Sequence, residues 1–326
     1  MNNYFLKKIK ELKSNISQSS LLQYANVLNN LYPNVKDDAD LEKALSMENL
    51  KKTISFIESN YTSSSTKWFK YNAIIALLKG LYNSKDDRYI YVSDKRDECN
   101  QNYLKNAGKL DSKQSLRMVT TEEYKQMLDE WKPNINILMN QTKVSKNEFM
   151  EIQSYFLAFI YFYHAIRIDI SPMLIIFKKL LPESDTTNYL HVFNKKYSFV
   201  FNAYKTSKTY GQNITALSNK SFTVELAEYI KFLKVYNNRT EGLRLFSNKS
   251  NSDYMDTSNI STLYKNIFKA RLGKSFNFTL NRKRFVSESK DVIDYVKSKE
   301  KVENLATDMM NSVNIQQKIY NVNSKK

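Results

Sequence analysis

Apolar residues recur at helical spacing through the first third of the chain. The segment 17–33 (SQSSLLQYANVLNNLYP) follows serine residues, and Pro33 comes after its last apolar position as a stop signal. Its apolar face consists of Leu21, Tyr24, Leu28 and Leu31. The segment 63–82 (SSSTKWFKYNAIIALLKGLY) repeats this scheme of hydroxyl residues before an apolar helix. The pattern predicts a small all-helical domain over residues 1–110.

The hydrophobic periodicity fades between about Ser84 and Leu116, where charged and polar residues dominate. We interpret residues 111–119, in the latter part of this segment, as an interdomain linker. Helical periodicity returns after it. Thr120 with Glu123, and Ser145 with Glu148, have the spacing of capping boxes, and the second pair opens the most apolar helix, which we expect to run to about Ala165.

After Pro172 the pattern changes to short runs of β-branched and aromatic residues. The segment 188–217 (NYLHVFNKKYSFVFNAYKTSKTYGQNITAL) predicts a three-stranded antiparallel meander. A helix ending at Gly273 and three further helices, near 281–300, 302–310 and 314–322, follow. The predicted fold class is therefore mainly α with a small antiparallel β-meander, and the second domain covers residues 120–326.

The charge balance points to a polyanionic partner. Lys and Arg number 50 against 33 Asp and Glu, which gives a net charge of +17. Nucleic acid is the first expectation, an anionic membrane is the second, and a merely soluble basic surface is the plain alternative. No apolar run is long enough to span a bilayer, and no secretory cleavage site is evident, so we expect no membrane partner and an intracellular protein. The composition does not distinguish nucleus, nucleoid and viral factory.

Composition also limits the metal and cofactor sites that the chain could form. One cysteine and two histidines cannot assemble a zinc site of the usual ligand set. Glycine occurs only five times, and neither a GxGxxG nor a GxxxxGK[ST] motif is present, which disfavours a phosphate-cradling loop. We expect no metal and no cofactor. The acidic pairs at 37–38 and 86–87 leave a metal-dependent nuclease open, although they fit solvated loops better.

Four stretches carry candidate chemistry, in the order HAIRIDISPM, YKTSKTYG, TLNRKRFVSES and MMNSVNIQQKIY. Each has an ordinary explanation when taken alone. Arg167 fits a cation at a helix end, Lys205 a hairpin charge, Arg282 a solvated helix start, and Tyr320 an aromatic plug of a core. Their joint order, with the lysine on a β-hairpin between helical segments, is less expected by accident.

This order resembles the tyrosine recombinase family, the phage integrases, in the form found in virophages and large DNA viruses. The family pattern is an arginine late in an early helix of the catalytic domain, a lysine in a β-hairpin, an HxxR helix start, a late His or Trp, and then the nucleophilic tyrosine. RKRFVSE is similar to the second-arginine motif, and MMNSVNIQQKIY is similar to the motif that ends in the tyrosine. The resemblance implies a helical core-binding domain followed by an α+β catalytic domain.

The second-arginine motif selects Arg282 over Arg284. The sequence departs from the family at two places, with Thr279 at the histidine of HxxR and Asn311 at the late His or Trp. Both side chains offer hydrogen bonds but no titratable imidazole. His164 and Arg167 also spell HxxR, but a meander follows them rather than helices and a tyrosine, so we expect His164 to be a packed residue.

The resemblance implies a metal-independent reaction on double-stranded DNA. Arg167 and Arg282 would bind the scissile phosphate, Tyr320 would attack it, and Lys205, or else Lys208, would protonate the leaving 5′ oxygen. The family acts as a homo-oligomer, typically a tetramer on paired sites, and cleavage in cis or in trans stays open. The alternatives are a type IB topoisomerase-like enzyme that relaxes DNA, and a non-catalytic DNA-binding descendant.

Overall fold

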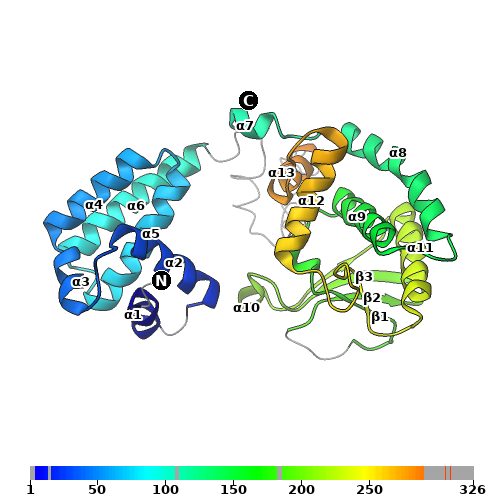
Figure 1. Cartoon of the computed structure of the whole chain (residues 1–326), viewed down its shortest axis with the longest axis horizontal. Coiled ribbons are helices and arrows are strands. Elements are labelled where there is room, and N and C mark those ends of the chain that lie inside the picture. Colours follow the sequence, from blue (N-terminus) through cyan, green and yellow to red (C-terminus); the bar gives the residue numbers. More distant parts are fainter. Residues whose placement is uncertain are drawn as a thin grey trace. The chain divides into compact units, whose positions relative to one another are not determined.

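The computed structural model describes residues 4–13, 16–106, 110–181, 186–289, 305 and 309. The chain divides into two compact units, Met1–Ala107 and Gly108–Lys326. Most described residues are helical, and a small sheet belongs to the second unit (Figure 1).

The described part of the first unit is built from helices alone. They are α1 (Tyr4–Leu12), α2 (Gln18–Leu31), α3 (Asp38–Ala44), α4 (Met47–Asn60), α5 (Ser64–Leu81) and α6 (Asp87–Asn106). The two helices predicted near 17–33 and 63–82 are confirmed as α2 and α5. Ser17 and Ser63 are their N-caps, and each side chain accepts a hydrogen bond from the backbone N–H three residues later.

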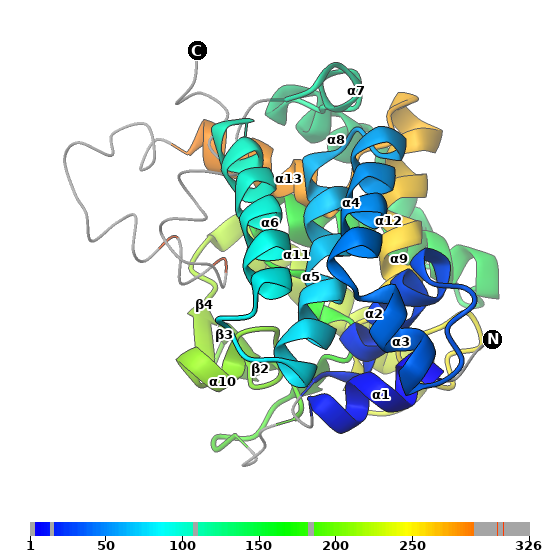
Figure 2. The same ribbon diagram turned by 90° about the vertical axis from the view of Figure 1, so that its left-hand side faces the viewer.

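Helix α6 was not predicted, because it falls where the hydrophobic periodicity fades. It packs along α5, beside α4, as both ribbon views show (Figures 1 and 2). Val92 and Cys99 are buried in the core of this unit, although the sequence around Cys99 is polar. A few apolar contacts therefore hold a helix whose remaining surface is hydrophilic.

The helices of the second unit are α7 (Ser112–Ser115), α8 (Thr121–Met139), α9 (Lys146–Tyr163), α10 (Ser207–Tyr210), α11 (Lys220–Asn237), α12 (Thr257–Leu272) and α13 (Phe278–Glu288), with a 3-10 turn, η1, at Ile168–Ile170. Both predicted capping boxes are confirmed, at the starts of α8 and α9. Helix α12 ends at Gly273 as predicted, with the glycine in the left-handed conformation. The short helix α7 lies inside the segment that was predicted to be a linker.

The described residues form one five-stranded sheet of order β4-β3-β2-β1-β5. The strands are β1 (Leu174–Ile176), β2 (Tyr189–Phe193), β3 (Lys196–Phe201), β4 (Asn213–Ala216) and β5 (Leu243–Arg244). Strands β2, β3 and β4 form the predicted antiparallel meander. The prediction of a purely antiparallel sheet is wrong, because β1 pairs in parallel with β2 and also carries β5. Strands of two and three residues give no sequence period, so only their pairing reveals them.

Helix α9 is the central element of this unit and packs against α8, α11 and α12 (Figure 1). Every residue from Ile152 to Tyr161 on this helix is buried. One hydrophobic core joins these helices to the sheet, through residues such as Phe156 of α9 and Phe199 of β3. The long apolar run is thus the core helix that the sequence predicted.

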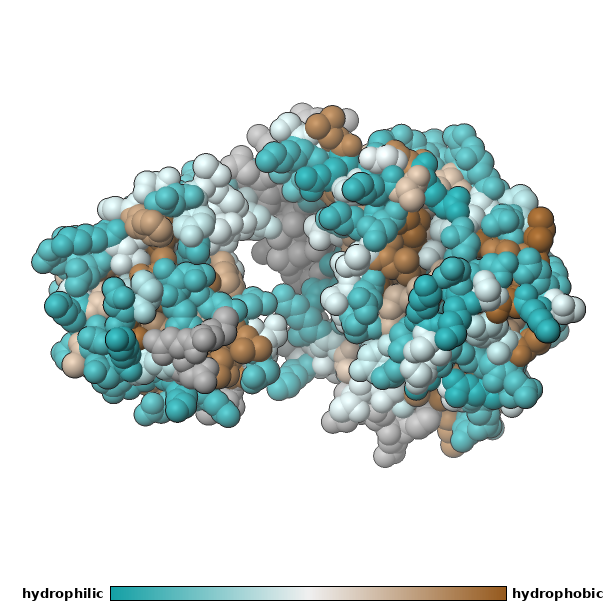
Figure 3. Space-filling view, in the orientation of Figure 1, coloured by the Kyte–Doolittle hydropathy of each residue, from teal (hydrophilic) through white to brown (hydrophobic). Residues whose placement is uncertain are grey.

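Within the described ranges, every helix is too short or too polar to cross a lipid bilayer. The face drawn in Figure 3 is largely hydrophilic, with hydrophobic residues scattered in small groups. Such scattered exposure is normal for a folded protein in water.

Candidate active site

A cavity of about 670 Å³ in the second unit collects four of the six predicted site residues, namely Arg167, Lys205, Thr279 and Arg282. The other lining residues are Ile168, Asp169, Thr257, Ser258, Ser261 and Phe278. They come from the turn after α9, the β3–α10 loop, the start of α12 and the start of α13. The predicted residues Asn311 and Tyr320 lie outside the described residues.

Arg167 does not lie late in a helix, as the resemblance implied. Helix α9 ends at Tyr163, and His164 and Arg167 both have extended backbone. Arg167 instead precedes the 3-10 turn η1, and its carbonyl oxygen accepts a hydrogen bond of 2.9 Å from the Tyr161 hydroxyl. A fully buried tyrosine of the core helix thereby fixes the backbone that presents this arginine.

Helix α13 presents Thr279 and Arg282, which are three residues apart and so lie on neighbouring positions of one face. Its start is fixed by Asn277, whose side chain accepts a hydrogen bond of 3.0 Å from the Leu280 backbone N–H. The ring of Phe278 stacks on Tyr264 of α12 at 4.1 Å between centroids. The buried Asn281 donates a hydrogen bond of 2.8 Å to the Tyr161 carbonyl, which ties α13 to α9.

Arg282 is only 7% exposed, although it lines the cavity. Its Nη2 donates a hydrogen bond of 2.9 Å to the carbonyl oxygen of Met309. Met309 itself is buried in a small cluster with Ala165 and Val286. The residue that contacts Arg282 therefore stands two positions before Asn311 and eleven before Tyr320 in the sequence.

Lys205 lies in the connection between β3 and β4, which pair antiparallel, so it occupies a hairpin connection as the sequence predicted. The short helix α10 lies in the same connection. Lys205 is exposed and lines the cavity, whereas Lys208, on α10, is exposed and does not line it. The geometry thus distinguishes the two lysines that the sequence left open.

The cavity carries an excess of positive charge, because Arg167, Lys205 and Arg282 are opposed by one acidic lining residue, Asp169. Burial raises the pKa of the Asp169 carboxyl, while the neighbouring Arg167 and Arg282 act in the opposite direction. Two guanidinium groups and an ammonium group in a partly buried site favour an anion with several oxygen atoms, such as a phosphate.

Sequence reasoning missed Asp169 and three hydroxyl residues at the start of α12. Asp169 is the only acidic residue of HAIRIDISPM, and this position could have drawn attention to it. Thr257, Ser258 and Ser261 were not predicted as site residues, because only the fold brings α12 to the cavity. The sequence predicted Ser258 as the cap of this helix, but the N-cap is Asp256, whose side chain accepts from the Asn259 backbone N–H. All three hydroxyl residues are exposed. The Ser258 hydroxyl already donates to the Asp256 carboxylate at 2.7 Å, whereas the hydroxyls of Thr257 and Ser261 can donate hydrogen bonds to an anion.

The two histidines lie outside the lining of this cavity. The His164 ring packs edge-on against Phe222 and Phe199, at 4.8 and 5.8 Å between centroids, so the expectation of a packed residue is confirmed. Burial lowers its pKa from 6.5 to about 4, which keeps the ring neutral at pH 7. His191 lies on β2, with Nε2 at 2.9 Å from the Lys178 carbonyl oxygen.

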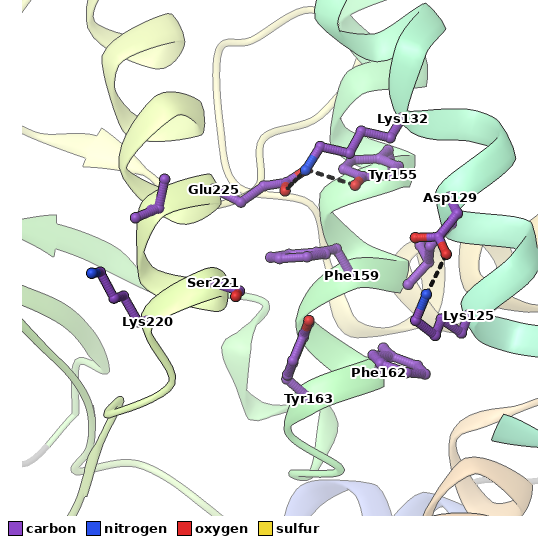
Figure 4. Close-up of a pocket in the computed structure, with 12 residues that line it drawn as sticks. Lys125, Asp129, Lys132, Tyr155, Phe159, Phe162, Tyr163, Lys220, Ser221 and Glu225 are labelled. Atoms are coloured by element: carbon purple, nitrogen blue, oxygen red, sulfur yellow. Dashed lines mark hydrogen bonds and ion pairs between the residues drawn. The ribbon is translucent and has the colours of Figure 1, made fainter. Parts of the chain in front are cut away.

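A second cavity, of about 430 Å³, lies between α8, α9 and α11. Figure 4 shows Phe159, Phe162 and Tyr163 of α9 along it. Two of its three lining lysines form ion pairs, Lys125 with Asp129 and Lys132 with Glu225, and the Tyr155 hydroxyl donates to the same Glu225 at 2.7 Å. This cavity contains none of the predicted site residues, and its internal ion pairs make it a weaker anion site than the first.

No protein-family model matches the chain, and neither curated proteins nor solved structures include one similar enough to match.

Proposed function

We propose that the protein is a tyrosine recombinase that cuts and rejoins double-stranded DNA through a 3′-phosphotyrosyl intermediate. The observation that carries the proposal is the cavity that gathers Arg167, Lys205, Thr279 and Arg282 from distant parts of the second unit. The family order of these residues, with Tyr320 at the end, adds the nucleophile.

In this proposal the two arginines bind the scissile phosphate. Negative charge grows on the non-bridging oxygens when a nucleophile attacks phosphorus, and planar guanidinium groups match those oxygens with paired N–H donors. Arg282 suits this role because its burial and its bond to Met309 hold the side chain before DNA binds. Preorganised donors need no rearrangement during the reaction.

The covalent step balances without a metal or a nucleotide. The Tyr320 phenol gives its proton to solvent water, its oxygen forms a bond to phosphorus, and the bond from phosphorus to the 5′ oxygen breaks. Lys205 gives a proton to that 5′ oxygen, which then leaves as a hydroxyl group. The phosphotyrosyl link keeps the bond energy, so the reverse attack by a 5′ hydroxyl rejoins the strand.

Thr279 and Asn311 complete the proposed site as neutral donors. Both would hydrogen-bond non-bridging oxygens where the family uses imidazole or indole groups. Such a bond needs a donor but no titration, so the departure from the family pattern is compatible with cleavage. The proposed catalytic residues are therefore Tyr320, Arg167, Lys205, Arg282, Asn311 and Thr279.

The proposed partner is duplex DNA, bound by a homo-oligomer on paired sites. The net charge of +17 supports binding to the phosphate backbone. Affinity should then fall steeply as salt rises, because each phosphate contact releases bound counterions.

Covalent capture tests the proposal without knowledge of the target sequence. The full chain is incubated with a pool of nicked duplexes of random sequence, whose short cleaved fragment diffuses away and traps the intermediate. The expected result is a protein–DNA adduct that survives denaturant and disappears after protease treatment. DNA binding without an adduct would favour the non-catalytic descendant, and plasmid relaxation without joined products would favour the topoisomerase-like enzyme.

A further inference from the structure

We infer that Asn188 is a positioning residue. It holds the β3–α10 loop, which carries Lys205, at a fixed position relative to the turn η1 that follows Arg167; the inference rests on the proposed function. Asn188 lies just before β2, is fully buried, and does not line the cavity. Its side chain bonds both segments that carry these two cations.

The side-chain amide of Asn188 makes four hydrogen bonds to backbone groups. Its Nδ2 donates to the Asp169 carbonyl at 2.8 Å and to the Ala203 carbonyl at 2.9 Å. Its Oδ1 accepts from the backbone N–H groups of Asn202 and Ala203, both at 2.8 Å. Two donor hydrogens and two acceptor lone pairs are the full capacity of an amide, so every one is used.

These bonds connect the two sides of the cavity. Asp169 stands two residues after Arg167, and Ala203 stands two residues before Lys205. A second amide extends the connection, since Asn202 donates to the Thr187 carbonyl at 2.7 Å and accepts from Gln212 at 2.6 Å. The loop between β3 and α10 is thus fixed by side-chain amides where the sheet ladder has ended.

This fixation matters because Lys205 is exposed, so the position of its backbone sets where its ammonium group can reach. A proton donor must lie within hydrogen-bonding reach of the leaving oxygen, and a displacement of about 1 Å can slow a reaction about 10²-fold. Asn188 therefore governs the distance from Lys205 to a phosphate held by Arg167.

Gln153 provides a matched control in the same unit. It is equally buried, and its amide also bonds backbone, accepting from the Ser247 N–H at 2.7 Å and donating to the Ser247 carbonyl at 3.1 Å. These bonds hold a loop that contributes no lining residue to the cavity. Gln153→Ala should therefore loosen the fold in a comparable way without moving Lys205.

The first measurement is hydrogen exchange on the full chain, which needs no DNA. Asn188→Ala should speed exchange of the amides in residues 202–206 about tenfold or more, since two of them lose their acceptor. Gln153→Ala should speed exchange near Ser247 and leave residues 202–206 unchanged. Unchanged exchange at 202–206 in Asn188→Ala would overturn the inference.

The second measurement compares single-turnover cleavage of ordinary DNA and of DNA with a 5′-bridging phosphorothiolate, whose sulfur leaves without a proton. The substrate carries a sequence recovered by covalent capture from the random pool. Asn188→Ala should cleave ordinary DNA about 10²-fold slower than wild type and recover on the phosphorothiolate. Gln153→Ala should show the same ratio between the two substrates as wild type.

Equal slowing of Asn188→Ala on both substrates would mean that Asn188 only supports the fold. If the wild-type chain forms no adduct with any DNA, the proposed function fails, and the role of Asn188 toward a general acid fails with it. The exchange data still report separately whether Asn188 holds the loop, so the two failures are distinguishable.

Discussion

Arg282 and Arg284 lie two residues apart on α13 and face different surroundings. Arg282 lines the cavity, whereas Arg284, which is 3% exposed, does not. The Arg284 guanidinium donates to the Thr121 hydroxyl, to the backbone carbonyl of Phe162 at 3.3 Å and to the side-chain Oδ1 of Asn281 at 3.2 Å, and it lies 3.6 Å from the Glu288 carboxylate. One arginine is thus available to a ligand, and the other joins α13 to α8 and α9.

This difference predicts opposite phenotypes for two alanine variants. Arg284→Ala should lower the free energy of unfolding by on the order of 3 kcal/mol, because it removes a buried cation that bonds one buried and two partly buried oxygen atoms. Arg282→Ala should abolish DNA cleavage and change stability less. Urea denaturation and single-turnover cleavage measure the two effects, and a reversed pattern would mean that Arg284 is the phosphate ligand.

The two lysines of the β3–β4 connection, Lys205 and Lys208, should also differ in how their removal affects DNA cleavage. Lys205→Ala should slow cleavage about 10²–10⁴-fold, the usual scale for loss of a general acid. Lys208→Ala is the matched control, since it removes an equal charge from α10 outside the cavity lining. Cleavage rates on ordinary and phosphorothiolate DNA decide between them, and selective rescue of Lys208→Ala would transfer the role to that lysine.

Thr279 offers a test of the neutral-donor interpretation. Thr279→Val removes the hydroxyl at nearly constant volume and should slow cleavage about tenfold, the equivalent of one hydrogen bond. Thr279→His restores the imidazole of the family pattern at an exposed lining position and should keep or raise the rate. Single-turnover rates at saturating DNA measure both, and a Val variant as fast as wild type would remove Thr279 from the site.

The buried ring of His164 should make the stability of the fold sensitive to acid. Its Nε2 is buried without a hydrogen-bond partner among the described residues, and burial lowers its pKa to about 4. Because the unfolded chain has a His pKa near 6.5, the unfolded state takes up the proton first as pH falls. The contribution of the neutral His164 to the free energy of unfolding is therefore fully present above pH 6.5 and is lost as pH falls toward 4. By pH 5 the loss is about 2 kcal/mol.

His164→Phe should remove that share of the pH dependence, since an aromatic ring replaces the imidazole between Phe199 and Phe222. Urea denaturation at pH 7.5 and pH 5 gives the difference for wild type and variant. Equal pH dependence in the two proteins would show that His164 takes up a proton as readily in the folded state as in the unfolded state.

Helix caps and the helical spacing of apolar residues predicted those helices whose sequences carry these features clearly. Thr120 and Ser145 open α8 and α9 as capping boxes, since an N-cap and its partner three residues later act within a single turn. Strands β1 and β5 were missed because they gain their hydrogen bonds only from distant partners. Helix α6 was missed because its stability comes from packing on α5 rather than from its own pattern.

The residues of the candidate site also fall into a group that the sequence predicted and a group that it did not. Arg167, Lys205, Thr279 and Arg282 were predicted from the order of motifs, and all four line one cavity. Asp169, Asn188 and the α12 hydroxyls were not found, because an amide that bonds backbone has no motif and its partners are set by tertiary structure. Asn311 and Tyr320 stay predictions from sequence alone.

Tyr320 is the residue that we propose forms the covalent bond to DNA. The most direct measurement is peptide mapping by mass spectrometry of the adduct captured on nicked DNA, with Tyr320→Phe as the matched variant that loses one hydroxyl and almost no packing area. We expect a nucleotide attached to Tyr320, and no adduct from the Phe variant at nearly unchanged DNA affinity. An adduct on another residue, or a Phe variant that forms the adduct at wild-type yield, would contradict this expectation.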